Sequence, residues 1–147
     1  IQAVSPGEFI ENLAYGLYFS QNALSNLHEI RTTLELGLIV RIMRDEKIVT
    51  ELVNTLRDRL QQMENVPEDT DAFVAADIAF HQAFFECVNN EAISKLASVV
   101  DEFMLRSKDD TKVLDRRDRV IREHREVVKA IARTTESCSS NSSVVST

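Results

Sequence analysis

The sequence predicts an all-α fold, an antiparallel bundle of about six helices, from two observations. Apolar residues recur at steps of three and four along almost the whole chain, which is the period of one face of a helix. Glycine and proline are scarce, with three and two among 147 residues, whereas sheet-rich folds need more of both at tight turns. Apolar residues make up 44% of the chain, enough to bury a core.

Six segments carry this helical period in chain order, and their expected bounds are 6–19, 26–44, 47–65, 69–89, 90–106 and 114–133. Pro6 fits the first turn of the first segment. The second and third have apolar stripes, and the stripe of the third consists of Ile48, Leu52, Leu56, Leu60 and Met63. The third ends before Pro67, because the residue preceding a proline is pushed out of the α region. An Asp or Thr can cap the fourth and Asn90 the fifth. The sixth follows a polar loop at 107–111.

Helical patterning ends after Arg133. Residues 134–147 hold six serines and carry no apolar stripe, so we expect a disordered tail behind a single domain at 1–133. Because the chain begins at Ile1 rather than a methionine, we expect a further domain to be missing before it.

The overall charge and the cysteine count narrow the function classes. A formal charge of −7 makes the chain a poor stand-alone binder of nucleic acid. Two cysteines are too few for a disulfide scaffold, which favours a reducing, cytoplasmic location. No apolar run is long enough to span a membrane, and no signal peptide is visible.

Polar residues at core positions are the strongest signal of a site. Asp77 and His81 are four residues apart on the inward stripe of the fourth helix, and His124 lies at the centre of the stripe of the sixth. A buried carboxylate must be paired, hydrogen-bonded or bound to a metal. One carboxylate and two imidazoles form a plausible site for Zn, Ni, Co or Mn. Periodicity alone favours the alternative, a metal-free Asp–His hydrogen bond.

Two further polar features have simpler interpretations. Arg31 and Glu35 form an i,i+4 pair beside apolar residues of the second helix. The pattern favours a salt bridge of small energy, and the alternative is that Arg31 reaches a cavity and binds a carboxylate by two hydrogen bonds. His28 begins the same helix among polar neighbours, so we expect it to be exposed and without a role.

Four motifs in register resemble the FCD domain, the effector-binding domain of the FadR branch of GntR-type bacterial transcription regulators. They are Glu29-x-Arg31-x3-Glu35, Asp77-x2-Phe80-His81, the Asn-containing turn at 87–93, and Glu123-His124 with Ala130-Ile131. The resemblance implies an antiparallel bundle with an internal ligand cavity. The segment at 6–19 is similar to an extra first helix found in some branches.

The resemblance also implies roles for residues. Asp77, His81 and His124 match the metal ligands of metal-binding members, and Arg31 matches a second anchor for a small organic or sugar acid. Such domains form homodimers and reach DNA only through a winged helix-turn-helix domain, which would precede Ile1. Metal-binding members usually supply another histidine from a final helix, but no histidine follows His124 here.

Three functions follow as hypotheses, led by a metal-assisted sensor domain that is not an enzyme. Effector binding would shift the bundle and reposition attached DNA-binding domains. A metal-dependent hydrolase is an alternative, since an open metal site can activate water. It lacks an evident general base, because Glu86 and Glu123 do not lie on the inward stripes. The other alternative is a metal-free structural or dimerising bundle with a buried polar network.

Overall fold

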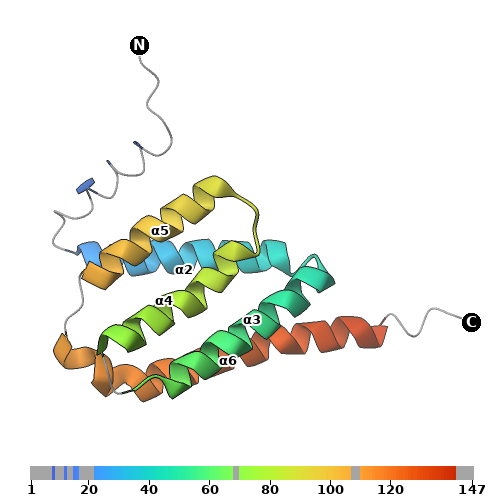
Figure 1. Ribbon diagram of the computed structural model, residues 1–147. Helices are drawn as coiled ribbons and strands as arrows, with labels where there is room; N and C mark the ends of the chain where they lie inside the picture. The colour runs from blue at the N-terminus through green and yellow to red at the C-terminus, as the bar shows by residue number, and fades with distance from the viewer. Residues whose placement is uncertain are drawn as a thin grey trace, which may run out of the picture.

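The computed structural model describes residues 22–67, 70–106 and 110–141, together with the isolated positions 8, 12, 15 and 16. Its helices, labelled in Figure 1, are α2 (Ala23–Ile42), α3 (Glu46–Asn65), α4 (Thr70–Glu86), α5 (Glu91–Arg106) and α6 (Asp110–Asn141). No strand occurs in the described part of the chain, so the predicted all-α fold is confirmed. The helix predicted at 6–19 falls outside the described residues, apart from those four isolated positions, and stays a prediction.

Local sequence signals set several helix ends. Asp45 precedes α3, and its Oδ1 accepts hydrogen bonds from the backbone N–H groups of Lys47 and Ile48 at 3.0 and 3.3 Å. Asn90 caps α5 in the same way, at 3.1 and 3.2 Å, as predicted. Each cap pairs amides that the first helical turn cannot pair. Val66, which precedes a proline, is extended at φ −63° and ψ 133°, and so α3 ends where the sequence predicts.

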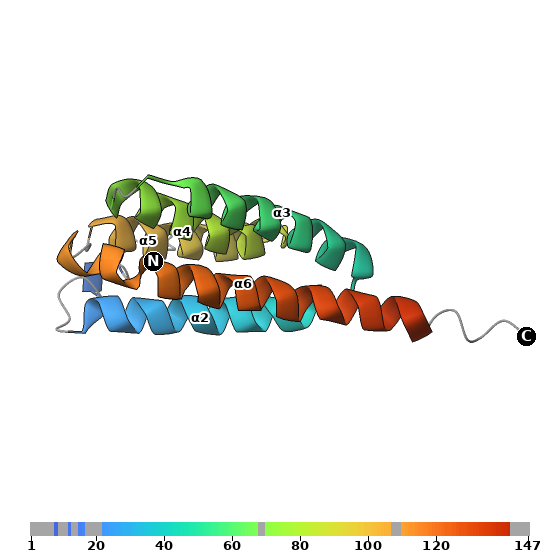
Figure 2. The same cartoon turned by 90° about the horizontal axis from the view of Figure 1, so that it is seen from below.

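Helix α4 is the centre of the bundle. It packs against each of the other four described helices, while α3 and α6 make the most extensive contact of any pair. Figures 1 and 2 show that α3 and α5 run opposite to α2, α4 and α6, so helices joined by a loop are antiparallel. This is the predicted antiparallel arrangement, and it brings side chains of α2, α5 and α6 to the surface of α4.

The apolar core lies mainly between α3, α4 and α6. On α3 the predicted stripe is buried except for Ile48, which is partly buried, and Leu52, Leu56 and Met63 are all 0% exposed. Phe80 and Phe84 face it from α4 and are 1% and 2% exposed. Burying one large apolar side chain contributes roughly 1.5–3 kcal/mol. The stripe therefore accounts for much of the attachment of α3 to the bundle.

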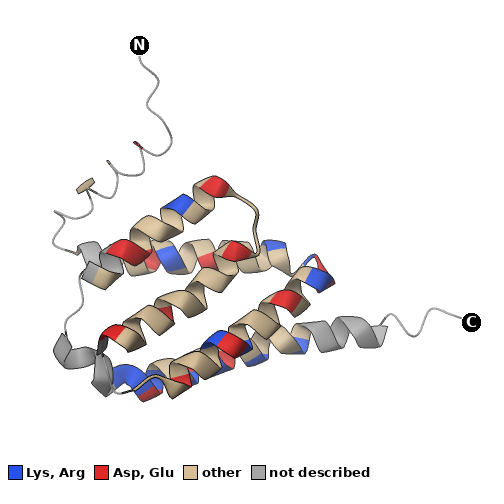
Figure 3. Cartoon of the chain, viewed as in Figure 1, with Lys and Arg blue, Asp and Glu red and all other residues tan. Residues whose placement is uncertain are grey.

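Charged side chains connect the C-terminal end of α3 to α6. Figure 3 shows acidic and basic residues close together there. Arg125 of α6 forms an ion pair with Glu64 of α3. Arg117 donates hydrogen bonds to the backbone carbonyls of Glu64 and Val66 at 3.1 and 3.2 Å, which pairs acceptors that the end of α3 leaves open. These contacts lie at the surface, outside the apolar core.

Helix α6 is longer than the sequence predicts at both ends. It begins at Asp110, inside the predicted loop, and ends at Asn141, whereas the predicted helix covers 114–133. The helix thus includes residues 134–141 of the segment that the sequence assigns to a tail, while residues 142–147 lie outside the described part. Serine and threonine cost only about 0.5 kcal/mol each in a helix, and extending a formed helix needs no new nucleus. None of the described helices is both long and apolar enough to cross a bilayer.

Candidate metal centre

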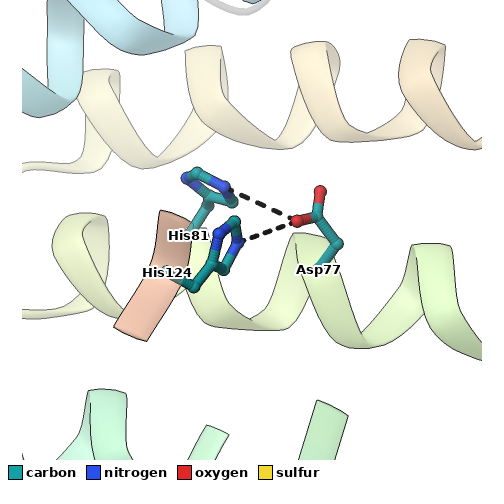
Figure 4. A group of neighbouring side chains, drawn as sticks. All are labelled: Asp77, His81 and His124. Atoms are coloured by element: carbon teal, nitrogen blue, oxygen red, sulfur yellow. Dashed lines mark ion pairs between the residues drawn. The ribbon is translucent and has the colours of Figure 1, made fainter. Parts of the chain in front are cut away.

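Three polar side chains from the apolar stripes meet inside the bundle. Asp77 and His81 lie one turn apart on α4, and His124 faces them from α6, as Figure 4 shows. Asp77 Oδ1 is 2.9 Å from His124 Nε2 and 3.7 Å from His81 Nε2. One possible ligand atom from each residue lies within 4.8 Å of the other two. The structure thus brings together the three residues that the sequence singles out.

Aromatic packing holds the two imidazole rings in place. His124 is 7% exposed, and its ring centroid lies 4.2 Å from that of Phe80. The rings of His81 and His124 are nearly perpendicular, at 88°, with centroids 4.9 Å apart. Close packing leaves such rings few alternative rotamers. Both Nε2 atoms are therefore held near the carboxylate of Asp77.

The carboxyl group of Asp77 is held in its charged form. Burial by itself would raise its pKa, but the interactions of Asp77 with His124, His81 and Arg31 outweigh burial and lower the pKa from 3.8 to about 2. Asp77 is therefore an anionic oxygen donor at neutral pH.

A second charged group, contributed by α2, α4 and α5, lies behind His81. Glu35 Oε1 is 2.7 Å from His81 Nδ1 and accepts a hydrogen bond from Arg31 Nε at 3.2 Å. Arg31 Nη1 lies 3.9 Å from Asp101 Oδ1, and Gln82 Nε2 donates to Asp101 Oδ2 at 3.1 Å. Arg31, the predicted effector anchor, is thus close to the candidate metal ligands, with its guanidinium between two carboxylates.

Only part of this second group has a signal in the sequence. The i,i+4 spacing of Arg31 and Glu35 predicts their ion pair, and that pair is present. Nothing in the spacing connects Glu35 to His81 or Arg31 to Asp101, because each contact joins two helices. Asp101 is 5% exposed, and burial raises its pKa despite the opposing effects of Arg31 and the hydrogen bond from Gln82. A carboxylate on the apolar stripe of the fifth helix was the signal that could have identified it.

The three-residue group fits a divalent metal. Oxygen and nitrogen ligands of a tetrahedral site, at about 2.0–2.2 Å from the metal, lie roughly 3.3–3.6 Å from one another. The observed separations of 2.9 and 3.7 Å lie on either side of that range. His124 Nε2 is also buried without a hydrogen bond of acceptable geometry, although Asp77 is near. Its contact with Asp77 at 2.9 Å is an ion pair, and a cation beside both residues would give this nitrogen a partner of regular geometry.

The described residues offer three protein ligands. Within the described part of the chain, no further His, Cys, Asp or Glu joins the group. His28 is exposed on α2, as predicted, and stands outside it. The printed sequence holds no histidine after His124. Three protein ligands leave a coordination position for water or a bound small molecule.

Comparison with protein families agrees with the motifs and the fold. The family model of the FCD domain matches residues 26–138, well over half of the chain, and this range includes the candidate ligands and the charged group behind them. The chain belongs to the FCD domain family. Comparisons with curated proteins and with solved structures gave no match. FCD domains are ligand-sensing domains of GntR-type regulators rather than enzymes, and they are often associated with metals.

Proposed function

We propose that this FCD domain senses a small carboxylate ligand beside a divalent metal held by Asp77, His81 and His124. The observation that carries the proposal is the convergence of one anionic oxygen and two imidazole nitrogens within 4.8 Å, on α4 and α6. This donor set suits Zn, Ni, Co or Mn. The bound cation would attract an organic or sugar acid to the position that the protein leaves open.

Each residue of the proposed site has a different role in binding. Asp77 contributes negative charge, the two histidines contribute directed nitrogen donors, and Phe80 closes one side of the site. Arg31 is the proposed second anchor, because a guanidinium can bind a carboxylate through two parallel hydrogen bonds. Its guanidinium already contacts Glu35 and Asp101, so the ligand would replace one of these contacts rather than fill a free position.

The position of the site supports a signalling role. Its ligand candidates lie on α4, which packs against every other described helix, and on α6. A ligand that binds one arrangement of α4 and α6 more tightly than another would shift the bundle toward that arrangement. We propose that an attached winged helix-turn-helix domain reads this shift in a cytoplasmic homodimer. Leu36 and Val40, exposed by 60% and 62% on α2, support a protein contact at that helix.

Zinc titration of the metal-stripped chain tests the proposal. In competition with a chromophoric chelator we expect one zinc ion per chain. Substitution His124→Ala removes a ligand, so it should weaken zinc binding by more than the roughly 10- to 100-fold that loss of an outer partner costs. His28→Ala is the matched control, because His28 is exposed and outside the group, and it should bind zinc as the unaltered chain does. Equal zinc affinities for the unaltered chain and His124→Ala would contradict the proposal.

A metal-free structural bundle is the second candidate. It is favoured by the direct 2.9 Å approach of His124 Nε2 to Asp77 Oδ1, which a charged imidazolium could explain without a metal. In that case zinc and chelator would leave the unfolding temperature unchanged. No organic acid would raise it either, in contrast to a sensor that binds its ligand in the folded state.

A further inference from the structure

We propose that Glu35 is a positioning residue that fixes the His81 ring in its metal-binding tautomer; this inference rests on the proposed function. Glu35 lies on α2 and is 12% exposed, whereas His81 lies on α4. The two residues are 46 positions apart in sequence, yet Glu35 Oε1 is 2.7 Å from His81 Nδ1. This is the shortest contact that His81 makes with a polar atom among those between described residues.

The contact between Glu35 and His81 can have only one direction. A carboxylate accepts hydrogen bonds and has no proton to donate, so Nδ1 of His81 is the donor. In the neutral ring, Nε2 is then left with a lone pair. That Nε2 is the atom drawn toward Asp77 in Figure 4, at 3.7 Å from Oδ1. Two electron-rich atoms at this distance share no hydrogen bond, whereas a cation between them would bind both.

Glu35 is itself held in position. The oxygen that contacts His81 also accepts the hydrogen bond from Arg31 Nε at 3.2 Å, so a single atom joins Arg31 to the ring. Arg31 is 4% exposed, and its Nη1 lies 3.9 Å from Asp101. Arg31 and Glu35 are also one turn apart on the same helix. Because these groups are shielded from water, the Glu35 carboxylate has little freedom to turn away from His81.

Through Glu35, helix α2 would affect how tightly the site on α4 and α6 binds a metal. A carboxylate that accepts the second N–H of a ligating histidine orients the ring and makes the ligating nitrogen a better donor, and its loss typically costs 10- to 100-fold in metal affinity. Here α2 carries both that carboxylate and the proposed anchor Arg31. The ligand site and the metal site would therefore be joined through Glu35 Oε1.

The tautomer can be measured without any metal. Long-range proton–nitrogen correlation spectra of the metal-stripped, histidine-labelled chain, at a pH where the ring is neutral, distinguish a protonated Nδ1 from a protonated Nε2. We expect the Nδ1–H form for His81. In Glu35→Gln the amide can either accept from the ring or donate to it, so the Nε2–H form should become populated. Glu29→Gln, an exposed glutamate on the same helix, is the matched control and should leave the spectrum unchanged.

Metal affinity is the second measurement, by zinc competition on the same three proteins and on Glu35→Ala. We expect about 10-fold weaker binding for Glu35→Gln and up to about 100-fold for Glu35→Ala, with Glu29→Gln unchanged. Circular dichroism and thermal unfolding check that each variant is folded, and the Gln variant keeps the size of the native side chain.

The outcomes separate this inference from the proposed function. A protonated Nε2 on His81 in the unaltered chain, or zinc affinity unaltered in both Glu35 variants, overturns the role of Glu35. If the unaltered chain shows the Nδ1–H form but binds no zinc, the proposed function fails while the orienting contact of Glu35 is supported. Loss of the Nδ1–H form together with weaker zinc binding in the Glu35 variants supports both.

Discussion

Two regions of the bundle differ in the polarity of the side chains that they bury. Where α3 packs against α4 and α6, the contact is apolar, with Leu52, Leu56 and Met63 wholly buried. Where α2, α5 and α6 pack against α4, the bundle holds its buried polar residues among those described, which are Arg31, Asp101 and His124. Charged groups are expensive to bury unless they are paired. The first region stabilises the fold, and we propose that the second keeps its buried charges for binding.

The apolar region should give the largest loss of stability on substitution. Leu56→Ala leaves a cavity among side chains that are 0% to 2% exposed, so it should lower the free energy of unfolding by about 3–5 kcal/mol. Urea unfolding measures this loss. Leu56 lies outside the candidate metal site, so zinc should stabilise Leu56→Ala and the unaltered chain by similar amounts. If zinc no longer stabilises Leu56→Ala, the two regions are not independent.

The polar region should give a smaller loss that has an electrostatic origin. Arg31→Met keeps the apolar stem but leaves Glu35 and the buried Asp101 without their shared cation, which should cost about 2–3 kcal/mol in urea unfolding of the metal-stripped chain. Arg57→Met, on the exposed side of α3, is the matched control and should change stability by less than about 0.5 kcal/mol. Equal effects of the two substitutions would remove the distinction between the regions.

The fold was largely predictable because helical periodicity reports burial directly. Leu52, Leu56 and Met63 repeat on one face, and that face is the buried one. Asn90 and the proline after Val66 mark helix ends through hydrogen bonding and sterics that are local in sequence. The end of α6 was not predictable in this way. Serine-rich composition is typical of disordered tails, but helix propensities alone do not decide whether an already formed helix continues.

The candidate site was predictable in part. Asp77 and His81 share one face of a helix at i,i+4 spacing, and His124 occupies a core position, so each was visible as a polar residue on an apolar stripe. The partners of these residues were not visible. Whether Glu35 meets His81, or Asp101 meets Arg31, depends on how α2 and α5 pack on α4, and no local pattern encodes that packing.

A crystal structure of the zinc-loaded chain, with anomalous diffraction at the zinc edge, tests the central claim most directly. The account predicts one anomalous peak at about 2.0–2.2 Å from an oxygen of Asp77 and from Nε2 of both His81 and His124. It also predicts that Glu35 remains hydrogen-bonded to His81 Nδ1. A zinc-loaded crystal with no peak between these three residues, or with zinc bound only elsewhere on the chain, would contradict the account.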